Sequence, residues 1–114
     1  MKTESQQLYL VLAKQWFNEI LSGNKTEEYR AFTDFYIKRL CLFDEEGYIS
    51  DVKQYDTVRF QQGYAKDAPQ MIVKIKQIRL DIDEDVDLDA GDLLTVDNCN
   101  FTIELGEILE KKNC

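Results

Sequence analysis

The first part of the chain carries a short apolar run followed by a periodic segment. Residues 8–13 read Leu-Tyr-Leu-Val-Leu-Ala, and a run of this length predicts a buried strand. In residues 14–23 the apolar side chains recur at i, i+1, i+4 and i+5, as Trp16, Phe17, Ile20 and Leu21. That spacing places them on one stripe of a helix, and the glycine at position 23 is a typical helix end.

The next thirty residues are more polar and contain a second helix signal. Residues 25–30 carry charges of both signs, and we expect them to be extended. Thr33 followed by Asp34 is a typical helix start. Residues 43–55 hold glycine, serine and many charges, which predict a loop. The apolar side chains expected on a common face of the second helix are Phe32, Phe35, Tyr36 and Leu40.

The second half of the chain alternates apolar and polar residues, which is the period of a half-buried strand. The alternation is clearest in residues 71–80, where Ile75 stands between Lys74 and Lys76. The other segments predicted to be strands are residues 57–64, 93–96 and 100–105.

These segments amount to five or six short strands, with two helices near the front of the chain. Helices early and strands late are typical of the α+β class, and we expect the sheet to curl into a small β-barrel. The length of 114 residues suits a single domain over residues 1–114. With 44% apolar residues the chain can form a core, which excludes wholesale disorder.

The net charge of −8 is concentrated in the last third of the chain. Residues 1–79 hold 12 basic and 11 acidic side chains, whereas residues 80–114 hold 2 and 11. A calcium loop starting at Asp81 would need glycine at its sixth position and a bidentate glutamate at its twelfth. The chain has Val86 and Asp92 there, so we expect a solvated acidic loop and neither a metal nor another cofactor.

Histidine is absent from the sequence, which excludes several kinds of active site. A Ser-His-Asp or Cys-His relay and an H-E-x-x-H zinc site all require it. Any general base must be lysine, aspartate, glutamate, tyrosine or cysteine, with a pKa tuned by its surroundings.

Cysteine use and the amino-terminal residues bear on the compartment. Cys41, Cys99 and Cys114 are far apart and form no C-x-x-C pair, so a zinc ribbon or a thioredoxin-type site is not predicted. Residues 1–7 are polar and unlike a secretory signal, and no apolar run approaches the ~20 residues of a membrane span. We therefore expect a cytoplasmic protein without a membrane partner. The sequence has no feature that is specific for DNA binding, and it leaves the oligomeric state open.

The most informative segment follows the first predicted helix and reads Gly-Asn-Lys-Thr-Glu-Glu-Tyr-Arg. In an extended strand Glu28 and Arg30 project from one face, and Lys25 lies just past the turn at Gly23. Arg30 is suited to bind Glu28 or an incoming carboxylate, phosphate or base edge. A surface strand with a local ion pair is the alternative interpretation of the same spacing.

This segment resembles the G-x-K-x-x-E-x-R signature of the ASCH family, a branch of the PUA-like superfamily. Gly23, Lys25, Glu28 and Arg30 match it with every spacing intact. Residues 56–64 resemble the family's strand that enters a glycine turn, and residues 101–108 resemble its closing strand. The similarity extends over roughly residues 8–109.

The resemblance implies a PUA-like barrel of five or six strands, with two or three helices at its side and a cleft lined by the signature. It also implies a protein that handles RNA or modified nucleosides. Some family members are amidohydrolases that deacetylate acetylated cytidine, and at least one is a ribonuclease. The amidohydrolases have threonine where this chain has Glu28, and Thr26 lies two positions too early to replace it.

Three functional hypotheses follow from the sequence. In the first, a module binds RNA or a nucleotide-like ligand through Lys25, Glu28, Arg30, Arg59 and Tyr64, with Tyr64 or Phe60 stacking on a base. In the second, a small nucleoside amidohydrolase or ribonuclease uses Lys25 and Glu28, with Glu104 as a further acid and Arg30 stabilising negative charge. In the third, the cleft is vestigial and the domain binds another protein.

Overall fold

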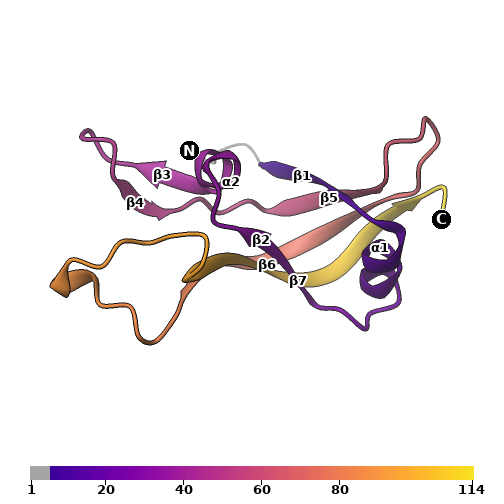
Figure 1. Cartoon of the computed structure of the whole chain (residues 1–114). Helices are drawn as coiled ribbons and strands as arrows, with labels where there is room; N and C mark the ends of the chain where they lie inside the picture. The colour runs from indigo at the N-terminus through magenta and orange to yellow at the C-terminus, as the bar shows by residue number, and fades with distance from the viewer. Residues whose placement is uncertain (1–5) are drawn as a thin grey trace. The chain divides into compact units, whose positions relative to one another are not determined.

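Seven strands, two α-helices and a short 3-10 helix follow one another in residues 6–114, the part of the chain that the computed structural model describes (Figure 1). No helix in this part is long and apolar enough to cross a membrane. In chain order the elements are β1 (Gln7–Leu12), α1 (Lys14–Leu21), β2 (Glu27–Ala31), α2 (Asp34–Leu40), β3 (Cys41–Phe43), β4 (Ile49–Val52), β5 (Thr57–Gln62), β6 (Gln70–Ile82), η1 (Leu88–Ala90) and β7 (Cys99–Lys112).

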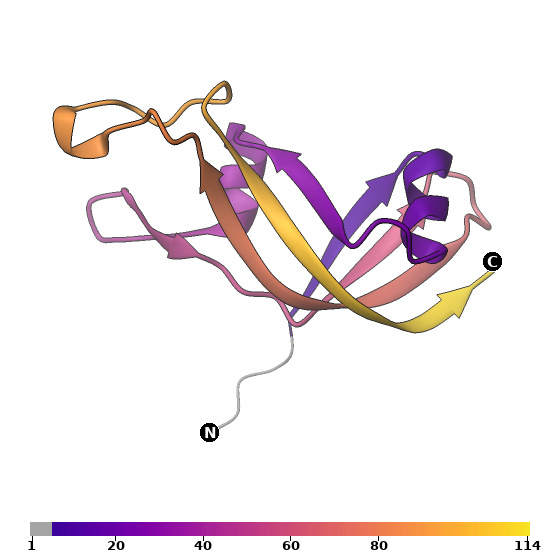
Figure 2. The same cartoon turned by 90° about the horizontal axis from the view of Figure 1, so that it is seen from below.

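Five of these strands form one mixed sheet in the order β1-β5-β6-β7-β2. Strand β1 is parallel to β5, β5 is antiparallel to β6, and β6 lies beside β7 (Figure 2). Strands β3 and β4 form a separate antiparallel pair. The predicted α+β class is therefore confirmed, with two α-helices and a five-stranded main sheet.

The chain divides into two compact units. The first comprises residues up to Glu28, Tyr55–Gln77 and Glu104–Cys114, and the second comprises Tyr29–Gln54 and Ile78–Ile103. In sequence terms the first unit holds nine basic and nine acidic side chains, and the second holds five and thirteen. The first unit is thus neutral overall and the second carries a net charge of −8.

The core of the first unit is built from rows of apolar side chains that run across three strands. The register places Leu8 opposite Val58 and Val58 opposite Val73. The next row joins Leu10, Phe60 and Met71 in the same way, and the side chains of both rows are buried. Because side chains alternate along a strand, the residues between them face away from this core.

Helix α1 completes this core with two of the four side chains predicted for its stripe. Phe17 and Ile20 are buried, whereas the Trp16 side chain is 47% exposed. Gly23 has φ +85°, the left-handed conformation typical of a helix end. The prediction of a common stripe is wrong for Trp16, because an eight-residue helix turns only a narrow face toward the sheet.

The second unit has its own core, in which the Phe32 and Phe101 rings have centroids 5.7 Å apart. Helix α2 begins as predicted, with the Thr33 hydroxyl accepting a hydrogen bond from the Tyr36 amide. The predicted apolar face of α2 is wrong for Phe35, whose side chain is exposed and packs edge-on against the Tyr36 ring.

Two further predictions about secondary structure are wrong. Residues 43–55 are not only a loop, because they include strand β4, which pairs with β3. The Asp44 carboxylate stabilises the turn between β3 and β4 by accepting hydrogen bonds from the backbone amides of Glu46 and Tyr48. Residues 93–96 form no strand. The backbone groups of these residues form hydrogen bonds with the Asn98 side chain, which donates to the Leu93 carbonyl and accepts from the Thr95 amide.

A polar contact in the second unit links β6 to β7. The Thr102 hydroxyl is fully buried and donates to an Asp81 carboxylate oxygen at 2.6 Å, while Arg79 contacts the other oxygen at 2.9 Å. The hydrogen bond from Thr102, reinforced by Arg79, holds the pKa of the Asp81 carboxyl below its usual value. The folded state therefore favours the ionised carboxylate.

Replacing Thr102 with valine should lower the free energy of unfolding by about 1 kcal/mol at neutral pH. Hydrogen bonds to charged groups contribute somewhat more than this when buried, but the Asp81 side chain is 45% exposed and screened by water. Since the pKa is lowered on folding, the stabilisation is complete above the unfolded value of about 3.9 and is lost as the pH falls through the folded value. The difference between Thr102→Val and wild type in urea unfolding should therefore shrink below about pH 4.

The matched control is Thr57→Val, because the Thr57 hydroxyl accepts from the exposed Gln7 side-chain amide and, among residues 6–114, has no carboxylate partner. Its effect should be small and should not change with pH. An effect of Thr102→Val that is constant from neutral to acidic pH would contradict the assigned role of Asp81.

Candidate functional site

The segment that carries the sequence signature begins with a turn that folds the chain back over the end of α1. Gly23 donates its amide to the Ile20 carbonyl, and Lys25 donates its amide to the Glu19 carbonyl at 3.0 Å. Two backbone hydrogen bonds thus anchor the turn to the last helical residues. The Lys25 side chain consequently starts next to α1.

The Lys25 ammonium lies between an acidic and an aromatic side chain. It is 3.7 Å from a carboxylate oxygen of Glu28 and 5.3 Å from the centroid of the Trp16 ring. The Lys25 and Glu28 side chains are only 19% and 9% exposed. A cation near an aromatic face and a carboxylate is stabilised by both, and more strongly where water is partly excluded. We call Trp16, Lys25 and Glu28 the lysine site.

The backbone beside Glu28 is held by the neighbouring strand. The Leu105 amide of β7 donates to the Thr26 carbonyl at 2.9 Å, one residue before β2 begins. In β2 the buried Glu28 stands between the less buried Glu27 and the exposed Tyr29. Strand alternation puts Glu28 on the opposite face from Glu27 and Tyr29, as the sequence predicted, and in the structure Glu28 is buried.

Arg30 belongs to the second unit, although it is only two residues after Glu28 in β2. Its guanidinium donates a hydrogen bond to the Tyr36 hydroxyl at 3.0 Å and lies 5.5 Å from the centroid of the Tyr36 ring. Helix α2 thus supplies a specific partner for Arg30.

The remaining predicted site residues lie in three different places of the first unit. Arg59 is exposed on β5 and lines a pocket together with residues of β6 and β7. Tyr64 follows Gly63 beyond the end of β5 and is 87% exposed. Glu104 lies in β7, where its carboxylate accepts a hydrogen bond from the Gln77 amide of β6. The structure thus brings Lys25 and Glu28 together, and it adds Trp16, which the sequence analysis had placed on a helix stripe and not in the site.

The surroundings of the two buried cysteines disfavour thiolate chemistry. Cys41 and Cys99 are free and buried, and burial raises the pKa of both thiols, with Asp83 adding to the effect at Cys99. The reactive thiolate is therefore disfavoured at both positions. Within residues 6–114, no group of three or more His, Cys, Asp or Glu side chains is arranged to hold a metal ion.

No protein-family model, no curated protein and no solved structure matches the chain.

We expect Lys25→Met to lower the free energy of unfolding more than Glu28→Gln does. The lysine substitution leaves a largely buried carboxylate without its cation, whereas the glutamine keeps a polar group of similar shape. The double mutant should reveal a coupling energy of about 1 kcal/mol, between the values of exposed and buried ion pairs. Urea unfolding of wild type, both single mutants and the double mutant measures this coupling.

A matched control pairs Glu28→Gln with Lys14→Met, since Lys14 is an exposed lysine of α1. The effects of these two substitutions should add. A coupling energy of zero for Lys25 and Glu28 would show that their contact contributes nothing to stability.

Proposed function

We propose that the chain is an ASCH-type domain of PUA-like fold that binds RNA or a modified nucleoside in the cytoplasm. The observation that carries the proposal is the lysine site: a sheltered lysine placed between a largely buried carboxylate and a half-exposed indole ring. The three residues belong to one unit, and two of them, Lys25 and Glu28, are signature positions.

The chemistry of the lysine site suits a nucleobase. A half-exposed indole ring can stack on a planar base, and such stacking on proteins is worth about 1–3 kcal/mol per base. The Glu28 carboxylate accepts a hydrogen bond from an exocyclic amine, and the Lys25 ammonium donates to a ring carbonyl or a phosphate. In this proposal Arg59 and Tyr64, which belong to the same unit, contact further parts of a longer RNA.

The distribution of charge supports this placement of the ligand. The lysine site lies in the neutral unit, whereas the whole net charge of −8 resides in the other unit. An RNA phosphate is repelled by like charge, and this repulsion falls off over about 8–10 Å at ordinary ionic strength. The neutral unit is therefore the part of the chain on which RNA binding costs least.

Binding is favoured over hydrolysis by the contacts of the signature side chains. A hydrolase would use Lys25 and Glu28 as acid and base, with Glu104 as a second acid. In the structure Lys25 contacts the Glu28 carboxylate, and Glu104 accepts a hydrogen bond from Gln77. The chain also has no histidine and no threonine at the position where the amidohydrolases have one.

Ligand-induced thermal shift with nucleosides, acetylated cytidine and short single-stranded RNAs tests the proposal. A ligand that binds only the folded state raises the melting temperature, and at a hundred times the Kd it adds about 2.7 kcal/mol of stability. We expect at least one compound to do so, and Trp16→Ala and Lys25→Ala each to weaken its binding about tenfold. Lys66→Ala, at an exposed lysine between β5 and β6, is the matched control and should bind normally.

Each alternative has its own outcome in the same experiment. Release of acetate from acetylated cytidine, or cleavage of RNA, abolished by Lys25→Ala, would identify a hydrolase instead. Binding that Trp16→Ala and Lys25→Ala leave unchanged would place the ligand elsewhere. The absence of any shift with folded protein would remove both nucleic-acid functions and leave the protein-interaction hypothesis.

A further inference from the structure

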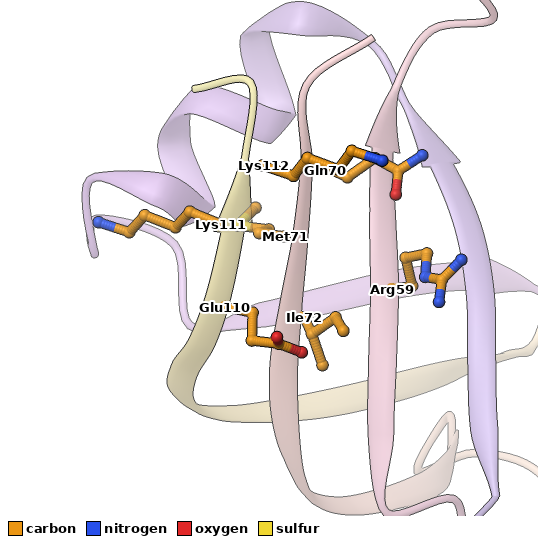
Figure 3. Close-up of a pocket in the computed structure, with 7 residues that line it drawn as sticks. All are labelled: Arg59, Gln70, Met71, Ile72, Glu110, Lys111 and Lys112. Carbon is orange, nitrogen blue, oxygen red and sulfur yellow. The ribbon is translucent and has the colours of Figure 1, made fainter. Parts of the chain in front are cut away.

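A second candidate site lies on the face of the sheet that points away from the core of the first unit. Strands β5, β6 and β7 line an open pocket of about 240 Å³ there (Figure 3). In β5, Arg59 stands between the buried Val58 and Phe60, so its side chain faces outward. The register places Ile72 of β6 directly opposite Arg59 on this same face.

Two cations, Arg59 and Lys112, line this pocket on the side of β5 and β6. Arg59 and Lys112 make no ion pair with any other residue in the part of the chain that the structure describes. Figure 3 shows Lys112 extending from β7 across β6 toward Gln70, on the side where Arg59 lies, whereas Lys111 extends the other way. Both charges are thus available to one ligand.

The remaining lining supplies a polar donor, an apolar surface and an acceptor. The Gln70 side chain donates one amide hydrogen to the Gln61 carbonyl oxygen at 2.8 Å, which fixes the orientation of its amide and leaves a second hydrogen for a ligand. Ile72 supplies an apolar surface, and the Glu110 carboxylate lies beside it in Figure 3. The pocket therefore offers two cations, an amide donor and one carboxylate acceptor around an apolar surface.

We infer that this pocket binds a phosphate monoester whose organic part carries hydroxyl groups. Arg59 and Lys112 form charge-assisted hydrogen bonds to the phosphate oxygens, with the Gln70 amide as a further donor. The carbon skeleton lies on Ile72, and Glu110 accepts hydrogen bonds from the hydroxyl groups. The negative charge on the ligand follows from the two cations, and the hydroxyl groups follow from the carboxylate acceptor.

The size of the pocket limits the ligand. Pockets for drug-sized molecules have volumes of about 300–1,000 Å³, so this one accommodates a sugar phosphate or a single terminal nucleotide. None of the pocket residues belongs to the lysine site. The pocket shares only Arg59 with the residues proposed to contact a longer RNA, so binding of a sugar phosphate here can be tested separately from nucleobase recognition at the lysine site.

Titration of the full chain with ribose 5-phosphate, followed by backbone amide NMR and calorimetry, tests the inference. We expect a Kd of about 1 mM or tighter, with amide shifts at Ile72 and Glu110. Ribose alone and methanol-sized alcohols should not bind, inorganic phosphate should bind more weakly, and uridine 5′-monophosphate should bind at the same residues if a terminal nucleotide is accommodated. Sulfate should compete more strongly than chloride at equal ionic strength.

Substitutions separate a specific site from general attraction of anions. Arg59→Gln and Lys112→Gln should each weaken ribose 5-phosphate binding about tenfold, whereas Lys66→Gln removes the same charge outside the pocket and should have no effect. Circular dichroism verifies that each variant is folded. No amide shift at the pocket, equal binding of ribose, or equal loss in all three variants would overturn the inference.

Discussion

The structure of the first unit depends on the register between β1, β5 and β6. Two rows of apolar side chains, which begin at Leu8 and Leu10, cross these three strands, and every member is buried. A slip of one residue in either pairing would turn a whole strand's apolar side chains toward water. Burying a large aliphatic side chain is worth about 1.5–3 kcal/mol, so alternative registers are strongly disfavoured. The same register brings Arg59 opposite Ile72 on the outer face.

The lysine site is built on this framework. Phe17 and Ile20 attach α1 to the buried side of the unit, and the turn at Gly23 then returns the chain to the helix end, where Lys25 meets Trp16. A hydrogen bond from Leu105 secures the segment before β2. Because a buried carboxylate without a cation is costly, the position of Glu28 and that of Lys25 constrain each other. The site is therefore formed by contacts that also stabilise the fold.

The two units differ in net charge somewhat less than the two parts of the sequence do, because the fold redistributes acidic residues between them. Glu104, Glu107 and Glu110 come from the acidic last third, but they belong to the neutral unit with Lys111 and Lys112. Acidic residues of the β3–β4 hairpin, such as Asp44 and Asp51, belong to the other unit. Both candidate sites in the first unit thus lie among balanced charges, where an anionic ligand meets the least net repulsion.

The sequence alone determined the class of the fold, most strands and both helices. Strong alternation in residues 71–80 and the Thr33-Asp34 helix start are local signals, and they specify local structure without help from distant residues. The strand prediction for residues 93–96 was wrong because backbone groups of this segment form hydrogen bonds with the Asn98 side chain. A pattern of apolar residues gives no sign of such side-chain hydrogen bonds. The extended segment that puts Glu28 on the opposite face from Glu27 and Tyr29 was likewise predictable, since strand alternation is a local property.

Only the tertiary structure decided which side chains meet. Trp16 has the spacing of a core residue, yet the three-dimensional path of the chain leaves it half exposed beside Lys25. Arg59 and Lys112 are more than fifty residues apart in sequence and line one pocket only because β5, β6 and β7 are neighbours in the sheet. Burial and pairing depend on distances between remote segments, and a single sequence encodes these only through the packing of the folded chain.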